Sequence, residues 1–233
     1  MGVIVNFRGP EWFYGIDALI QFFGAFIAII LAIYGFKAYW VSRERKYLLF
    51  GSAFALLGLD LIIYAILIPA GYIYYSFYPG VYLGVLLDAV RFLHFIFVAA
   101  TLLAYTLLIS VYAKLNRRVI IALLGSLVLV IAGFVYRYQS ITGFNLVSVM
   151  LLGFIMIYTG RNWISRKTAS AGAVFLAFML MALGHVAFIG SSISDRAFMI
   201  GHLLQLVGYI SLLYGLFIML KKNAKKNTTP EQL

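Results

Sequence analysis

Long hydrophobic runs alternate with short polar segments along the whole of this 233-residue chain. An α-helix rises ~1.5 Å per residue, so ~20 apolar residues cross the ~30 Å hydrocarbon core of a bilayer. Seven runs approach or exceed this length, and the pattern therefore predicts an all-α, polytopic membrane protein with seven transmembrane helices. The predicted spans are 14–36, 47–69, 83–113, 119–136, 142–160, 169–190 and 197–220.

The composition excludes a soluble globular protein. Of the residues, 64% are hydrophobic and 11% are charged, and the mean hydropathy is +1.02. Such a chain has too little polar surface to cover a particle in water, so lipid must solvate most of it. The net charge of +11 comes from short basic clusters between apolar runs, which indicates contact with anionic lipid headgroups and not with nucleic acid. The absence of cysteine excludes disulfides, thiolate metal ligands and iron–sulfur clusters.

The distribution of lysine and arginine predicts the orientation. Fourteen of the 18 lie beside the ends of spans 1, 3, 5 and 7, and three, Arg8, Arg137 and Arg196, lie on the other side. Cytoplasmic loops carry the excess of basic residues, so the N-terminus is expected outside and the C-terminus inside, in a multi-pass protein of the cell membrane. Segment 221–233 is expected to be a disordered, basic cytoplasmic tail.

Two features of the segments between spans bear on the fold. Five tyrosines between positions 72 and 82 crowd the loop predicted after span 2, as in an interfacial aromatic belt. None of the four prolines, Pro10, Pro69, Pro79 and Pro230, lies in the interior of a predicted span, and Pro69 is the last residue of the second. This placement argues against the hinged helices of a rocking transporter.

The sequence also contains signs of an internal repeat. Spans 1–3 and 5–7 run in the same directions, which permits a duplicated three-helix unit with span 4 as a linker, in a 3+1+3 arrangement. Trp40-Val41-Ser42-Arg43 follows span 1, and the similar Trp163-Ile164-Ser165-Arg166 follows span 5. Parallel repeats of this kind occur in transporters, where the binding site lies at the repeat interface.

The three histidines of the chain are predicted to lie at one depth. His94 is 20 residues from Lys114, His185 is 18 from Lys167, and His202 is 19 from Lys221. At ~1.5 Å per residue, all three lie ~27–30 Å from the basic anchors, near the outer boundary of the membrane. Asp17 joins this layer, and Asp60 lies ~9 Å deeper. Ionisable groups inside a span are unfavourable, so each requires a structural or functional reason.

Helical spacing links further polar residues to this layer. Asp88, Arg91 and His94 are three residues apart on one side of span 3, and His202 and Gln205 share a face of span 7. The sequence thus predicts a polar, ligand-binding pocket that opens to the outer side. Its candidate residues are Asp17, Asp60, Asp88, Arg91, His94, Asn145, His185, His202 and Gln205.

Three chemical interpretations of these residues stay open. His94, His185 and His202 with a carboxylate could bind Zn²⁺ and leave one position for water. Two of the imidazoles could instead be axial ligands of a haem b iron. In the simplest interpretation, the histidines contact water and headgroups, and Asp60 and Arg91 make hydrogen bonds between helices.

Two segments resemble prokaryotic seven-helix sensory input modules, which often precede histidine kinases or cyclases. They are His202-Leu203-Leu204-Gln205-Leu206-Val207-Gly208-Tyr209 and Phe50-Gly51-Ser52-Ala53-Phe54-Ala55-Leu56-Leu57-Gly58. The resemblance implies a sensor-like membrane domain, and because no output domain accompanies it, a partner membrane subunit is expected to carry any signal. The leading hypothesis is a stand-alone, non-enzymatic module that binds a small ligand or membrane partner. The alternatives are a haem- or metal-binding redox or hydrolase subunit and a small proton-coupled transporter.

Overall fold

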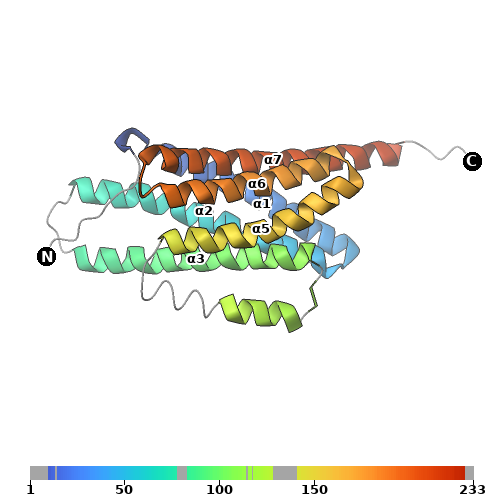
Figure 1. Cartoon of the computed structure of the whole chain (residues 1–233), viewed down its shortest axis with the longest axis horizontal. Coiled ribbons are helices and arrows are strands. Elements are labelled where there is room, and N and C mark those ends of the chain that lie inside the picture. The colour runs from blue at the N-terminus through green and yellow to red at the C-terminus, as the bar shows by residue number, and fades with distance from the viewer. Residues whose placement is uncertain are drawn as a thin grey trace, which may run out of the picture.

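The computed structural model describes residues 10–13, 15–77, 83–113, 115–116, 118–127 and 141–228. Every regular element in these ranges is helical, and six helices are long and apolar enough to cross a membrane. The described elements are η1 (Glu11–Phe13), α1 (Ile16–Ser42), α2 (Arg45–Phe77), α3 (Leu83–Tyr112), the short helix Arg118–Leu127, α5 (Ile141–Arg166), α6 (Ala169–Gly190) and α7 (Asp195–Thr228) (Figure 1).

The six long helices form a closed ring. Each packs extensively against two others, in the order α1, α2, α3, α5, α6 and α7, and α7 packs back against α1. The largest fully buried side chains include Phe54, Leu108, Leu152 and Phe178, which come from four different helices. The hydrophobic core therefore lies inside the ring, and the outward faces carry apolar side chains suited to lipid.

Small residues allow the closest helix contacts. A Cβ added at Gly35 of α1 would lie only 2.8 Å from the Cα of Gly51 on α2. A Cβ at Gly208 of α7 would lie 3.0 Å from the carbonyl oxygen of Ala177 on α6. Association of helices in lipid depends on such close backbone packing, because lipid is as apolar as the side chains that it solvates.

The turns that follow α1 and α5 share one geometry. Arg43 and Lys167 both have a left-handed backbone, with φ of 56° and 50°, and each amide donates to the carbonyl four residues earlier at 2.7 Å. The next helix begins two residues later in both cases. At the second turn, the Thr168 hydroxyl accepts from the amide of Ala171 at 3.4 Å and caps α6. The two hairpins are therefore closed in the same way.

Several helices extend beyond the spans predicted from hydropathy. α6 has the predicted bounds 169–190, but α2 continues through Pro69 to Phe77. The tyrosines at 72, 74 and 75 are therefore helical, so the predicted loop was wrong for these residues, and Pro69 lies inside the helix, three residues beyond the candidate membrane span Arg45–Ile66. Proline removes one backbone hydrogen bond, and membrane helices tolerate this loss where neighbouring groups replace it.

The predicted disorder of segment 221–233 was wrong for its first eight residues. α7 continues through Lys221 and Lys222 to Thr228. Lysine is a good helix former, and its charge interacts favourably with the carbonyl end of a helix. Residues 229–233 lie outside the described ranges.

The fourth predicted span is described only in part. α3 and α5 run in the same direction, so Tyr112 at the end of α3 and Ile141 at the start of α5 lie toward opposite ends of the bundle (Figure 1). The helix Arg118–Leu127 covers the first half of the predicted span 119–136, and Leu127 packs against Val98 of α3 and Phe144 of α5. The second half lies outside the described ranges.

Candidate functional site

His202 is the most enclosed of the histidines. It lies on the inner face of α7 with 1% of its surface exposed, and its Nδ1 is 2.9 Å from Nε2 of Gln21 on α1. The Gln21 amide nitrogen can only donate, so Nδ1 accepts and the neutral ring carries its proton on Nε2. Nε2 is buried and has no hydrogen-bond partner among the described residues. An N–H donor is therefore held in the interior without an acceptor.

His185 lies at the centre of a hydrogen-bonded chain across three helices. Its Nδ1 is 2.7 Å from Oδ1 of Asn145 on α5, and its Nε2 is 3.0 Å from the hydroxyl of Tyr105 on α3. The Asn145 oxygen can only accept, so Nδ1 carries the proton and Nε2 of the neutral ring accepts from Tyr105. His185 and His202 are therefore neutral rings with opposite tautomers.

Asp60 is buried in α2, with 1% of its surface exposed. Its Oδ2 accepts a short hydrogen bond from the hydroxyl of Thr101 on α3, and its Oδ1 is unpaired among the described residues. It also interacts electrostatically with Tyr105 and with Tyr209 of α7. Asp60 thus faces the inside of the ring, beside the hydrogen-bonded chain that contains His185.

These contacts define an interior polar cluster. Its members come from all six long helices and are Gln21, Asp60, Thr101, Tyr105, Asn145, His185, His202 and Tyr209. Ser148, one helical turn below Asn145 on α5, is also buried, and its hydroxyl is unpaired among the described residues.

Aromatic rings separate the histidines of this layer. Phe188 of α6 lies between His185 and His202, at ring-centroid distances of 6.2 Å and 4.8 Å. His94 of α3 stacks on Phe97 at 6.1 Å, and Phe97 is 5.3 Å from Tyr64, which is itself 6.3 Å from His202. The histidines therefore belong to one continuous layer of rings without meeting one another.

This arrangement bears directly on the zinc hypothesis. In the part of the chain that the structure describes, no three His, Cys, Asp or Glu side chains form a group able to hold a metal ion. Nδ1 of both His185 and His202 is already hydrogen-bonded, and Phe188 fills the space between the two rings. The geometry gives no support to a three-histidine zinc site.

The enclosure of the cluster differs from the open outer pocket that the sequence predicted. Phe13 of η1 packs 6.0 Å from the His202 ring, and Phe198 packs 4.5 Å from it. η1 therefore covers His202 at the end of the bundle where α1 begins.

The remaining predicted site residues have different positions. Asp17 begins α1, where its Oδ1 accepts from the amides of Gly15 at 2.9 Å and Ala18 at 2.8 Å, so its role in helix initiation is evident. Gln205 packs its side chain against Gly184 of α6. Asp88 and Arg91 belong to α3, but their side chains lie outside the described part of the chain.

Sequence reasoning missed half of the interior polar cluster. Gln21 and Thr101 are uncharged, so the unfavourable energy of a buried charge did not single them out. Tyr105 and Tyr209 are of a type expected at membrane interfaces, yet both are buried in the core. One signal was present, because Gln21 lies four residues after Asp17 and so shares its helix face.

Among the described residues, the cluster presents hydrogen-bonding groups and no arrangement typical of nucleophilic catalysis. Its unpaired groups among the described residues are an acceptor, Asp60 Oδ1, and a donor, the Nε2 of His202, and the Ser148 hydroxyl beside Asn145 is a third unpaired group. Comparison of the chain with protein-family models, with curated proteins and with solved structures found no match. The function is therefore inferred from these side chains.

Proposed function

We propose that this chain is a non-enzymatic, seven-helix protein of the cell membrane that binds a small polar ligand in the interior polar cluster. The orientation that we propose places the N-terminus outside and the C-terminus in the cytoplasm, because fourteen basic residues lie on one side and three on the other. Six helices of membrane-spanning length and apolarity support the location in a membrane.

The observation that carries the proposal is the pair of unpaired buried atoms, Asp60 Oδ1 and His202 Nε2. Native proteins leave few buried polar atoms unpaired, and each such atom is unfavourable by ~1–3 kcal/mol. A ligand that supplies both a donor and an acceptor would remove this penalty.

The proposal requires one small molecule that reaches from Asp60 Oδ1 to His202 Nε2. Tyr64 contacts the His202 ring, and Asp60 lies one turn earlier on the same face of α2, which corresponds to ~6 Å along the helix. Tyr209, two turns after His202 on α7, interacts with Asp60 at the deeper level. A hydroxyl, ammonium or amide N–H facing Asp60 and a carbonyl or carboxylate oxygen facing His202 would satisfy both.

The test is a thermal-shift screen of the purified protein against amino acids, monosaccharides and nucleobases. Binding in the cluster predicts that a compound raises the Tm of the wild type and of the control variant Ser211→Ala, whose hydroxyl bonds its own helix. The same compound should leave the Tm of Asp60→Asn and His202→Ala unchanged. If no compound in the panel acts on the wild type, or if all four proteins respond alike, the cluster is structural.

The haem and zinc alternatives are tested on the same preparation. An absorption spectrum reports haem through its Soret band, and elemental analysis reports zinc and iron. A Soret band that disappears in His94→Ala, His185→Ala or His202→Ala, or stoichiometric zinc lost in the same variants, would replace the ligand-binding proposal with a redox or hydrolase role.

A proton-coupled transporter is the second candidate, and Asp60 favours it. The carboxyl lies in the middle of α2 with one free oxygen, and the same helix contains Pro69. A carboxyl that carries a proton needs such a position, and a proline provides a place for the helix to bend. Proton flux into proteoliposomes that is unaffected by Asp60→Asn would exclude this candidate.

We also infer that the ring arose from a duplicated three-helix unit, as the 3+1+3 arrangement requires. Exchanging α1 with α5, α2 with α6 and α3 with α7 turns each helix contact of the ring into another observed contact. The contact of α1 with α2, for example, becomes that of α5 with α6. The matching turns at Arg43 and Lys167 add support, although the similar tryptophan motifs are offset by one residue relative to these turns. The interior polar cluster would then lie at the interface of the two units, where repeat proteins bind ligands. A sensor-like role, with signal transfer to a partner subunit, agrees with this position.

A further inference from the structure

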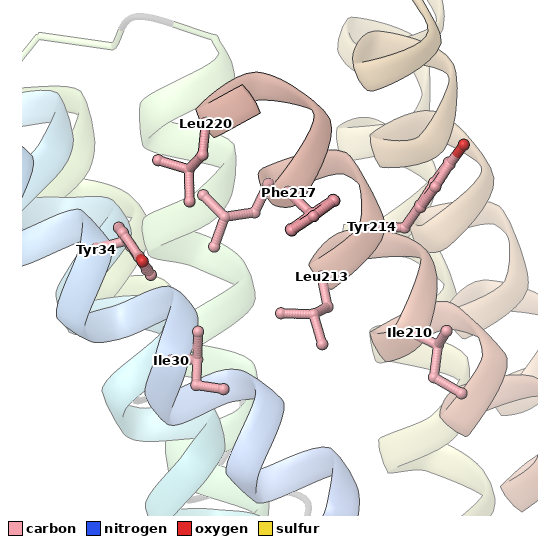
Figure 2. Close-up of a pocket in the computed structure, with 8 residues that line it drawn as sticks. Ile30, Tyr34, Ile210, Leu213, Tyr214, Phe217 and Leu220 are labelled. Carbon is pink, nitrogen blue, oxygen red and sulfur yellow. The ribbon is translucent and has the colours of Figure 1, made fainter. Parts of the chain in front are cut away.

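The outer surface of the ring contains an apolar groove between its first and last helices. Its volume is about 410 Å³, and it is lined by Ile30 and Tyr34 of α1 and by Ile210, Leu213, Tyr214, Leu216, Phe217 and Leu220 of α7. Figure 2 shows Ile30 and Tyr34 on one side, facing Leu213, Phe217 and Leu220 on the other. A pocket of this size can hold part of a lipid, and none of its lining residues belongs to the interior polar cluster.

Both walls of this α1–α7 groove end in a lysine on the same helix face. On α1, Ile30, Tyr34 and Lys37 follow at spacings of four and three residues. On α7, Tyr214, Phe217 and Lys221 follow at spacings of three and four. Residues at these spacings lie above one another on a helix, so Lys37 and Lys221 flank the same end of the groove.

The two lysines have no acidic partner in the described part of the chain. Both side chains are exposed. The ion pair seen among the described residues joins Lys46 to Glu44 and involves neither of them. The groove therefore combines a long apolar surface with two uncompensated positive charges at one end. An acyl chain attached to an anionic headgroup has the complementary pattern.

The length of the groove also matches one leaflet. Its α7 wall runs over the ten-residue interval from Ile210 to Leu220, which corresponds to ~15 Å at ~1.5 Å per residue. This is half of the ~30 Å hydrocarbon thickness of a bilayer. A chain that begins at the lysines would thus end near the middle of the membrane.

The lining favours a lipid over a helix from another protein. Membrane helix interfaces are rich in small residues, as α7 itself is where Gly201, Gly208 and Gly215 face α6. The α1–α7 groove contains leucine, isoleucine, phenylalanine and tyrosine but no glycine or alanine. Such bulky, flexible side chains suit a mobile acyl chain better than a close-packed backbone.

We propose that the α1–α7 groove binds one anionic phospholipid, with an acyl chain along Ile30, Leu213 and Phe217 and the headgroup phosphate between Lys37 and Lys221. Binding of the lipid would hold the first and last helices of the ring together. The interior polar cluster is not part of this site, so a negative result here would leave the proposed function untested, and the reverse also holds.

The test compares dioleoylphosphatidylglycerol with dioleoylphosphatidylcholine, which have the same acyl chains. Native mass spectrometry of the detergent-purified full chain measures the affinity for each lipid. The wild type should bind phosphatidylglycerol more tightly, and the double variant Lys37→Gln, Lys221→Gln should bind it about 30-fold more weakly, at ~1 kcal/mol for each lysine. The control Arg161→Gln, Arg166→Gln removes the same charge from exposed positions on α5 and should keep the preference.

A second pair of variants tests the acyl-chain part of the site. Leu213→Trp fills the groove and should weaken binding of both lipids, whereas Leu203→Trp, exposed on α7 outside the groove, should not. Equal affinity of the wild type for the two lipids, or an equal loss in the two charge variants, would overturn the proposal. So would a native dimer that Leu213→Trp dissociates, because the groove would then be an interface between two copies.

Discussion

Replacing Tyr105 with phenylalanine isolates one hydrogen bond of the interior polar cluster. Tyr105 is buried in α3, its hydroxyl is 3.0 Å from Nε2 of His185, and its ring packs edge-on against the imidazole at 5.9 Å. Phenylalanine keeps the ring and its packing and removes only the hydroxyl. The His185 Nε2 would then be a buried acceptor without a donor.

The expected loss of stability follows from two magnitudes. Hydrogen bonds between membrane helices contribute ~0.6 kcal/mol on average and up to ~1.7 kcal/mol, because the separated helices find other partners. A buried acceptor left unpaired is unfavourable by ~1–3 kcal/mol. His185 has no second donor for Nε2 among the described residues, so we expect a loss of ~1.4 kcal/mol, a tenfold change in the unfolding equilibrium.

Unfolding by sodium dodecyl sulfate in mixed micelles, followed by circular dichroism, measures this loss. Tyr112→Phe is a matched control, because Tyr112 lies two turns further along the same helix face and makes a ring contact with Phe178 but no described hydrogen bond. Nitrogen-15 NMR of His185 should place its proton on Nδ1 in the wild type. Equal stability of the two tyrosine variants, or a proton on Nε2, would refute the hydrogen-bonded chain from Tyr105 through His185 to Asn145.

Three further predictions concern packing, helix initiation and topology. Gly208→Ala should destabilise the protein by ~1–3 kcal/mol, because the new methyl group meets a backbone carbonyl at 3.0 Å. Gly153→Ala has open space around it and should stabilise α5 by up to ~1 kcal/mol. Thermal unfolding of the two variants should therefore show changes in stability of opposite sign. Asp17→Ala should lower stability by ~0.5–2 kcal/mol, because the amides of Gly15 and Ala18 lose their acceptor, and should leave ligand binding in the interior polar cluster unchanged. A variant as stable as the wild type would contradict a role of Asp17 in starting α1. Reporter tags should be accessible outside the cell at the N-terminus and only after permeabilisation at the C-terminus; tags in one compartment would contradict an odd number of spans.

Hydropathy predicted the helices well where apolar runs end at charged residues. α6 begins and ends at the predicted positions because Lys167 and the Ser191–Ser194 turn bound it sharply. It failed where a helix continues past the end of its apolar run, since backbone hydrogen bonds do not depend on apolar side chains when the residues favour a helix. The extensions of α2 beyond Pro69 and of α7 beyond Leu220 are of this kind.

Residue depth could be predicted from the sequence, but lateral position could not. Counting from the basic anchors placed the histidines at one level, and the continuous layer of rings around them is consistent with that level. Whether they meet depends on the rotation of each helix, which close contacts such as that of Gly208 with Ala177 fix. The pairing of Gln21 with His202 likewise depends on α1 and α7 being neighbours, which nothing in either segment encodes alone.

The closure of the ring between α7 and α1 has a consequence for biogenesis. During synthesis, α1 is made before α7, so Gln21 cannot pair with His202 until α7 has been synthesised. The unfinished bundle must therefore hold a polar amide against lipid, or against the insertion machinery, for most of its assembly. Ribosome-bound intermediates that end before Asp195 should consequently be sensitive to proteases and membrane quality control. This sensitivity should disappear once α7 is present and His202 pairs with Gln21.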